Sequence, residues 1–576
     1  MKSYQLKTLR LALLAATMAA SSAPLSAFEW QVVANNGDFM PTGQCNPAGP
    51  NPTTPPCRKF NSFNQPSVSA KQMVVMRARS RGGQGLGQPV HGVYTRDMAT
   101  AGPVVKILDR STRVPEPNNR GSVFIEPPSF PRIDIGSNTM ATRGNHQPVW
   151  KVLDPASGDI LEQLGTSGIY TNPYGNLITG ASKLGAVAAF SFFEVPEAPG
   201  TPFDVFPGSP AVTDGTTIVF KGNYTVNLTG KTGVYYRDLM NQPISSAAGL
   251  LSPAGGNNPV MLIANNTDSL IPGTSTVFGS TAPPSAANHQ AVFAGFDNED
   301  NPTLGGIYLA PLNGTPLPPL KTLVSIGEQV PGESRHDRFN RLGEGVSFDG
   351  RFVGFWGAWG AETTALTLRC PTEGNAERIV FCNQQYPQGF TVQVPLHQGI
   401  FVHDTKTGHT SVVAKTSEKF SNFVYWNFSG LVPGASEGDD DGEPARWRSA
   451  SFVAVSGLVD GKLTDATFHT AFKARTGSVA DGSYVNPVDG IYLRKGPGAP
   501  ATVTVVETGM GGTLLDPEAV YDDDENPATP AVMLPVTEMG IEREGLRGNT
   551  LVINVSMGSE EAGWAGIYLT KVPDVK

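Results

Sequence analysis

The sequence is poor in charge, in cysteine and in histidine. Charged residues make up 16% of the 576 positions, and the chain contains 4 Cys and 8 His. It lacks the Gly at every third position that collagen requires, and its 39% of apolar residues, with 28 Phe and 14 Tyr, are too many for a disordered chain. Turn formers are abundant instead, with 65 Gly and 48 Pro. This composition favours a folded protein of many short strands and turns.

Long apolar runs are also missing, since no stretch approaches the roughly 18 apolar residues that a membrane span needs. The run Leu11–Ala20 follows Lys2, Lys7 and Arg10, and small residues come after it. This order is typical of a secretory signal peptide, which we place at residues 1–27. We therefore expect an exported mature chain, periplasmic or extracellular, without a membrane span.

The charge balance excludes two classes of partner. Removing residues 1–27 takes away three cations and no acids, so the formal net charge goes from -9 to -12. Nucleic acid and anionic lipid favour clustered Lys and Arg, and an acidic exported protein is a poor match for either. No Cys-x-x-Cys-His is present, which excludes covalently attached c-type haem.

The four Cys fall into two local pairs, Cys45 with Cys57 and Cys370 with Cys382, each twelve positions apart. Four Cys allow three connectivities, and the local one suits two loops rich in Pro and Gly. In an oxidising compartment both pairs are expected to form disulfides, each stabilising by roughly 3 kcal/mol in the chain-entropy model. The spacing does not match a zinc knuckle, so metal binding is the weaker interpretation.

One apolar-aromatic motif recurs along the whole chain. It has seven copies, separated by 76, 65, 73, 93, 91 and 76 residues. Gly, then a β-branched residue, then an aromatic residue is typical of a strand entry. The copies are Gly92-Val93-Tyr94, Gly168-Ile169-Tyr170, Gly233-Val234-Tyr235, Gly306-Ile307-Tyr308, Gly399-Ile400-Phe401, Gly490-Ile491-Tyr492 and Gly566-Ile567-Tyr568.

Two companion segments keep a fixed order around the motif. An alternating strand such as 217–220 or 351–355 precedes it, and a Val-rich strand such as 412–414 or 503–506 follows it. With one further strand before the turn, each unit has about four strands. Four antiparallel strands repeated seven times predict an all-β, seven-bladed β-propeller. It forms a single domain over residues 28–576, with loop insertions around 42–58, 357–397 and 458–489.

The two ends of the chain complement one another. The last motif copy is followed only by residues 569–576, so its Val-rich partner strand is missing. The segment Trp30–Ala34 has that pattern and lacks a preceding partner. We predict that this N-terminal strand completes the C-terminal blade and closes the ring, which removes exposed sheet edges.

The repeats resemble those of bacterial exported propeller proteins. The turn and strand from Val212 to Phe220 and the Gly-Ile-Tyr units look like TolB-type repeats. The Gly-Asp-x-x-Pro turn with a Phe-rich strand containing Phe60 and Phe63 is similar to uncharacterised secreted tandem repeats that carry an Asn-x-x-Gly turn. The resemblance spans roughly residues 30–572. It implies a fold and an exported scaffold, and it transfers no catalytic residue.

Strand alternation places most large insertions on one face of the propeller. In a four-stranded blade, the second-to-third connection and the blade-to-blade connection emerge on the same face. We therefore expect one elaborated face, dominated by units five and six, and loops on a rigid scaffold are where function concentrates. The insertions lie at 45–57, 79–91, 145–167, 357–397 and 458–489.

A polar cluster is expected on that face, at Arg335, His336 and Arg338. A His beside Arg could act as a general base while Arg neutralises a carboxylate, as a uronate lyase requires. A solvated turn is the competing interpretation, because surface charges are usually solvated. Further candidates for ligand binding lie close in sequence, although Trp also packs between blades; they are Arg341, Trp356 and Trp359.

An acidic loop is the candidate metal site. Asp439, Asp441 and Glu443 lie in a segment with acids and Gly at EF-hand positions, but Arg448 stands where the bidentate Glu belongs. Two interpretations of the loop stay open, a looser structural calcium site and a solvated turn. A calcium site predicts a raised melting temperature with calcium, and no shift at millimolar calcium would contradict it.

Two function classes follow from the sequence. The first is a non-catalytic exported propeller that binds a polysaccharide or an envelope protein partner through its elaborated face. The second is a carbohydrate-active enzyme, with a polysaccharide lyase that acts on an acidic glycan as the favoured kind; this class rests partly on analogy between folds.

Overall fold

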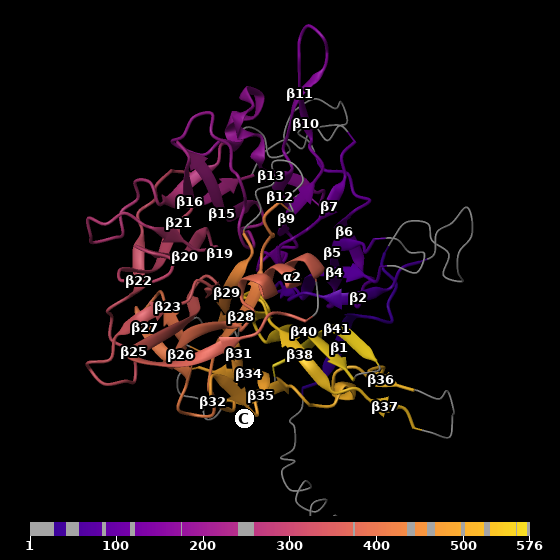
Figure 1. The fold of residues 1–576 in the computed structure, drawn as a ribbon, viewed down its shortest axis with the longest axis vertical. Coiled ribbons are helices and arrows are strands. Elements are labelled where there is room, and N and C mark those ends of the chain that lie inside the picture. The colour runs from indigo at the N-terminus through magenta and orange to yellow at the C-terminus, as the bar shows by residue number, and fades with distance from the viewer. Residues whose placement is uncertain are drawn as a thin grey trace, which may run out of the picture.

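The computed structural model describes residues 28–41, 57–82, 88–115, 121–173, 175–239, 258–372, 375–434, 444–457, 467–496, 502–522, 530–559 and 562–572. Seven antiparallel sheets, each with four strand positions, are arranged around a ring (Figure 1). The prediction of a seven-bladed β-propeller is therefore confirmed.

The first four blades follow the chain without exchange of strands. Blade 1 contains β2 (Phe60–Phe63), β3 (Ser67–Val68), β4 (Met73–Ser80), β5 (His91–Asp97) and β6 (Val105–Asp109). Blade 2 contains β7 (Phe124–Glu126), β8 (Arg132–Ile133), β9 (Met140–His146), β12 (Ser167–Thr171) and β13 (Ile178–Ser182). Blade 3 contains β14 (Ala211–Thr213), β15 (Thr217–Val226), β16 (Thr229–Asp238) and β17 (Met261–Asn265). Blade 4 contains β18 (Ser280–Thr281), β19 (Ser285–Ala287), β20 (Gln290–Phe296), β21 (Gly305–Pro311) and β22 (Lys321–Ser325).

The last three blades carry the longer connections. Blade 5 contains β23 (Phe339–Leu342), β24 (Ser347–Phe348), β25 (Phe352–Leu368), β26 (Phe390–Asp404) and β27 (His409–Lys415). Blade 6 contains β30 (Val453–Gly457), β31 (Phe468–Arg475), β34 (Asp489–Lys495) and β35 (Val503–Glu507). Blade 7 contains β38 (Val536–Gly540), β39 (Leu546–Arg547), β40 (Thr550–Gly558), β41 (Gly563–Lys571) and β1 (Trp30–Asn35).

The remaining elements lie in the connections. Four are two-stranded hairpins: β10 (Trp150–Leu153) with β11 (Ile160–Leu164), β28 (Val424–Ser429) with β29 (Arg446–Ser451), β32 (Ser478–Ala480) with β33 (Ser483–Val485), and β36 (Val520–Tyr521) with β37 (Val532–Met533). The helices are η1 (Lys183–Ala186), η2 (Ala188–Phe193), α2 (Ala376–Gln385) and η3 (Gly512–Leu514).

The short strands β3, β8, β14, β19, β24, β30 and β39 form the inner wall of the ring. Each contacts the next one in this order, and β39 contacts β3 in turn, so the circle is complete. In five blades the first strand position is divided into two short strands, such as β2 and β3, that pair with the same neighbour. The interruptions allow the chain to turn toward the axis.

The predicted closure by the N-terminal strand is confirmed. β1 pairs antiparallel with β41, with Trp30 opposite Thr570 and Asn35 opposite Gly566. β1 therefore occupies the outer position of blade 7, which β6 and β35 occupy in their own blades. Pairing the two chain ends in one sheet covers an edge of β41 that would otherwise be open.

Packing explains the spacing of the Gly-x-aromatic motif. The motif lies on the third strand of each blade, where the Gly and the aromatic residue two positions later share a face. A Cβ at Gly92 would lie 2.5 Å from the hydroxyl oxygen of Tyr94, and one at Gly233 would lie 2.6 Å from that of Tyr235. The ring lies back over the glycine, and a side chain there would collide with it.

Seven clusters of buried apolar side chains hold the ring together, one between each pair of neighbouring blades. The motif aromatic is usually packed edge-on against a Phe that precedes the inner strand. Phe60 and Tyr94 have ring centroids 5.1 Å apart at 87°, and Phe124 and Tyr170 are 4.8 Å apart at 90°. This geometry is favourable for aromatic pairs. The repeated motif therefore serves blade packing.

Candidate functional site

The axis of the ring is filled by residues 541–547 of blade 7, which follow β38 and include β39. Arg132 of blade 2 pairs with Glu542 at 3.4 Å and with Glu544 at 3.3 Å. Ser347 of blade 5 donates to the carbonyl of Arg543. Arg132 is fully buried, and Glu544 is 4% exposed. These contacts join distant blades across the axis of the ring.

Most elements outside the blades lie in two types of connection. Within the predicted insertion 458–489, however, Phe468–Arg475 forms β31 of blade 6. The hairpins β10–β11 and β32–β33 and the helix α2 lie between second and third strands of their blades, and β28–β29 and β36–β37 lie between blades. Both types of connection emerge on the same face of an antiparallel blade. In Figure 1, α2, β28 and β29 lie over the middle of the ring. We call this side the elaborated face.

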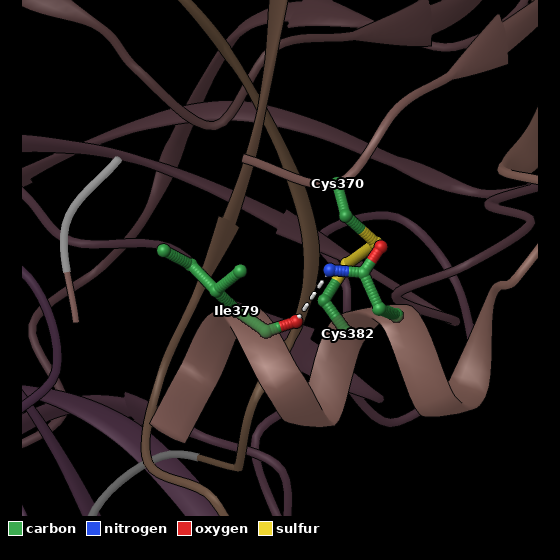
Figure 2. The surroundings of a disulfide bond; sticks show 4 residues. Cys370, Ile379 and Cys382 are labelled. Atoms are coloured by element: carbon green, nitrogen blue, oxygen red, sulfur yellow. Dashed lines mark hydrogen bonds between the residues drawn. A yellow bond between two sulfur atoms is a disulfide. The ribbon is translucent and has the colours of Figure 1, made fainter. Parts of the chain in front are cut away.

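A disulfide fixes the largest insertion. Figure 2 shows the bond between Cys370, just beyond β25, and Cys382 in α2. The predicted pairing of these two Cys is confirmed, and Cys382 is fully buried. The helix begins at a cap where the Asn375 side chain accepts from the backbone N–H of Arg378. The disulfide favours an oxidising compartment.

Three predicted residues lie outside the described part of the chain, in the proposed calcium loop: Asp439, Asp441 and Glu443. The same holds for Cys45, so the predicted Cys45–Cys57 bond stays a prediction. Within the described ranges, no group of three or more His, Cys, Asp or Glu residues is arranged to hold a metal ion. Structural calcium therefore stays a prediction.

The predicted catalytic residues Arg335, His336 and Arg338 share one turn between β22 and β23 on the elaborated face, and their side chains are exposed. Arg335 Nε donates to His336 Nε2 over 3.2 Å. Asp337 accepts from the backbone N–H of Ser334, which stabilises the turn itself. The structure thus brings the three residues together, and their catalytic role stays a prediction.

Trp356 and Trp359 point to opposite sides of blade 5. Trp356 packs in the cluster shared with blade 6 and donates from Nε1 to Gln398 over 3.0 Å. Trp359 packs in the cluster shared with blade 4 and stacks on His397, with centroids 6.1 Å apart. The rings are only 7% and 4% exposed, so they offer little surface to a ligand. Arg341 lies on β23, partly exposed, and its binding role stays a prediction.

A pocket of about 250 Å³ lies on the elaborated face between blades 5 and 6. The end of the extended β25 contributes Leu366–Leu368, Arg369 follows directly, and β28 contributes Val424–Trp426. Arg475, the last residue of β31, and Ser483–Tyr484 of β33 complete the lining. Three separate insertions therefore converge on one pocket, which we call the aromatic pocket.

A tight turn holds the wall formed by β32 and β33. Asp481 and Gly482 have φ of 49° and 71°, the left-handed pair that a two-residue hairpin needs. The backbone N–H of Thr367 donates to the carbonyl of Gly482 over 2.9 Å, which ties the hairpin to the end of β25. The sequence Asp-Gly thus places Tyr484 beside blade 5.

Arg475 is held rigidly in the aromatic pocket. Its Nε and Nη2 donate to the two carboxylate oxygens of Asp489 over 2.6 and 2.7 Å. Its guanidinium carbon lies 4.4 Å from the ring centroid of Tyr484 and 5.2 Å from that of Tyr425. Burial alone would lower the pKa of Arg475, but the hydrogen bonds and charge of Asp489 raise it above its usual value. The side chain is therefore a fixed cation between two rings.

Tyr484 is oriented by a buried amide. Asn422 is 1% exposed, and its Nδ2 donates to the hydroxyl of Tyr484 and to the carbonyl of Val424. The Asn422 Oδ1 accepts from the backbone N–H of Val424 over 3.0 Å. Because one residue fixes both the ring and the start of β28, the two walls of the pocket keep a set distance.

A second cation lies behind Tyr425. Lys473 Nζ is 4.3 Å from the ring centroid of Tyr425 and 5.9 Å from that of Phe452. Lys473 is 8% exposed, and this burial lowers its pKa from the usual value. Burial also raises the pKa of the Tyr425 hydroxyl.

The arrangement suits binding better than covalent chemistry. It combines flat aromatic rings with a cation that is already paired, and a ligand with an apolar face and polar edges fits such a lining. Sequence reasoning missed these residues because β25, β28, β31 and β33 are far apart in the chain. The usable signals were the Tyr425-Trp426 pair and the Asp481-Gly482 turn.

No helix within the described ranges is long and apolar enough to cross a membrane. No protein-family model matches the sequence, and no curated protein is similar to it at a significant level.

Solved structures similar to this chain have several different activities in their names. Polysaccharide lyase Uly1 has 9% identity and a TM-score of 0.26, over 96% of this chain and 94% of that one. Fructan 1-exohydrolase IIa from Cichorium intybus has 9% identity and a TM-score of 0.23, over 89% and 94% of the two chains. The tricorn protease has 12% identity and a TM-score of 0.17, over 87% and 55%. At these values the likenesses carry no argument about function.

Proposed function

We propose that this protein is an exported propeller scaffold that binds a polysaccharide in the aromatic pocket of its elaborated face. The observation that carries the proposal is the fixed pair of Arg475 and Tyr484, set at 4.4 Å between guanidinium carbon and ring centroid. The export half of the proposal rests on the signal-peptide pattern at residues 1–27 and on the Cys370–Cys382 bond.

Sugar rings have one face of C–H groups and edges of hydroxyl groups. Tyr484, Trp426 and Tyr425 supply aromatic surface for the C–H face, while Arg475 and Ser483 supply polar atoms for the edges. The rings are already positioned by Asn422 and Asp489, so little side-chain entropy is lost on binding. A preorganised lining of this kind supports recognition of a glycan.

An envelope protein partner is the second candidate, and a separate feature favours it. A groove of about 450 Å³ lies beside α2, lined mainly by apolar side chains that include Val380, Phe381 and Pro433. Val380 is 55% exposed there. An apolar groove beside a helix is a common form of protein docking surface.

The lyase hypothesis for Arg335, His336 and Arg338 stays a prediction. Elimination needs a base and a neutralising cation near the same sugar, and the exposed turn supplies both residue types. Loss of turnover in His336→Ala would support it.

Affinity electrophoresis of the mature protein in gels containing neutral or acidic polysaccharides tests the proposed function. Retardation should be lost in Tyr484→Ala and kept in Tyr484→Phe, because the second variant keeps the ring and loses only the bond from Asn422. Unchanged retardation in Tyr484→Ala, with both variants folded, would place binding elsewhere. Retardation by none of the polymers would turn attention to the groove along α2.

A further inference from the structure

We infer that the sugar unit held in the aromatic pocket is acidic, bearing a carboxylate or a sulfate group; this rests on the proposed function. The inference comes from the charges in and around the lining, where Arg369 and Arg475 are present and no Asp or Glu is. An anionic group would supply what the lining lacks.

The charges around the pocket are mainly positive. Arg369 lies at its rim, Arg475 in its wall and Lys473 behind Tyr425. Among the described residues Arg369 makes no ion pair, and Asp489 has both oxygens engaged by Arg475. Among the described residues, the charges of Asp489 and of Glu538 in blade 7 raise the pKa of Lys473, against the larger effect of burial. A cationic pocket stands out in a chain whose net charge is -9.

Donors without acceptors point the same way. The Tyr425 hydroxyl and the Trp426 indole Nε1 are buried and have no hydrogen-bond partner among the described residues. Nη1 of Arg475 also makes no hydrogen bond to them, because Asp489 engages only Nε and Nη2. These two atoms are closed off from the pocket surface, so the donor that remains for a ligand is Nη1 of Arg475, and an oxyanion would accept from it.

Each cation contributes in a different way. Arg475 is a rigid fork whose third nitrogen remains for a ligand, whereas Arg369 is exposed and can close over a bound group. Lys473 contributes its charge through the ring of Tyr425 at 4.3 Å, where little solvent screens it. Neutralising Arg369 and neutralising Lys473 should therefore each weaken binding of an acidic polymer on its own.

The experiment compares matched polymers. Polygalacturonate is set against its fully methyl-esterified form, and dextran sulfate against dextran, with dissociation constants measured by calorimetry at low and high salt. The charged member of a pair should bind at least tenfold more tightly, with the advantage falling as salt rises. The polygalacturonate pair tests recognition of a carboxylate, and the dextran sulfate pair tests recognition of a sulfate.

Variants assign the effect to the pocket. Arg369→Gln and Lys473→Met should each weaken binding of the charged polymer about tenfold or more, while Lys406→Gln, which neutralises a cation at the β26–β27 turn on the opposite face, should not. Thermal melts check folding, and Arg369→Gln alone suffices if Lys473→Met is unstable.

In one outcome, charged and neutral polymers bind with equal affinity, and this binding is lost in Tyr484→Ala but unaffected by Arg369→Gln. That result would overturn the inference of an acidic ligand and leave the proposed function standing. Binding to no polymer would overturn both.

Discussion

Arg132 and Glu544 meet on the axis of the ring, with 3.3 Å between Nε and Oε2, although they belong to blades 2 and 7. Their side chains are 1% and 5% exposed. Glu544 also lies 3.9 Å from Arg547, and its backbone carbonyl accepts from Val68 of blade 1. The segment 541–547 thus links blades that are not adjacent, whereas each inter-blade cluster joins only two neighbouring blades.

Glu544→Leu should destabilise the protein by about 3–5 kcal/mol, because Arg132 would keep a buried charge without this carboxylate. Urea unfolding measures the change. The control is Glu299→Leu, which removes an exposed pair with Arg446 in which both side chains are about half exposed, 47% and 49%. The control should cost about 1 kcal/mol or less. Equal losses in the two variants would contradict a stabilising role for the axial pair.

Gly92→Ala should cost roughly 1–3 kcal/mol, the usual range for overpacking a core. The new Cβ would lie 2.5 Å from the Tyr94 hydroxyl oxygen and 2.8 Å from the carbonyl oxygen of Leu108, and the latter belongs to the backbone. Gly230→Ala is the matched control, since nothing lies within 4 Å of a Cβ there. Denaturant midpoints of the two variants should differ clearly, and a neutral Gly92→Ala would disprove the packing explanation of the motif.

The ion pair of Arg351 and Asp404 predicts a pH dependence. Arg351 Nε and Nη2 donate to the carboxylate over 2.8 and 2.7 Å, which lowers the pKa of Asp404 from 3.8 to about 2. The lowered pKa means that the stabilisation is full above about pH 4 and is lost as pH falls toward 2. Asp404→Asn should therefore cost about 2 kcal/mol at pH 6 and almost nothing at pH 2. A constant difference between the proteins across that range would contradict the assignment.

Local spacing was enough to predict the blades, because each copy of the motif reports the same packing of an aromatic ring over Gly. The closure by Trp30–Asn35 could also be predicted, because the last repeat lacks its final strand and the N-terminus has a strand with no repeat of its own. The aromatic pocket could not be predicted from the sequence. Tyr425, Arg475 and Tyr484 meet only through the β28 and β32–β33 connections, whose paths no repeat pattern specifies. Trp356 and Trp359 were predicted for a ligand, but alternation along β25 buries them between blades.

His336→Ala should leave the melting temperature nearly unchanged, because the side chain is exposed and its ring nitrogen contacts only the neighbouring Arg335. The ultraviolet absorbance of unsaturated sugar ends, followed on acidic polysaccharides, then decides its chemistry. Product formed by the native protein and absent in the variant would establish His336 as essential for elimination. Product formed equally by both would remove it from the catalytic candidates.

Loss of the Cys370–Cys382 disulfide should affect the aromatic pocket more than it affects the stability of the blades. Cys370 directly follows Arg369, and its bond to Cys382 fixes that end of β25 to α2. In the double variant Cys370→Ser, Cys382→Ser, local opening of residues 375–385 should become easier by roughly 3 kcal/mol in the chain-entropy model, which hydrogen exchange measures. The blade strands, held by the inter-blade clusters, should keep their exchange rates. Affinity for an acidic polymer should fall as Arg369 loses its fixed attachment. Slow exchange retained across residues 375–385 would mean that packing of α2, through contacts such as Arg378 Nε to the carbonyl of Gly430, holds the helix without the bond.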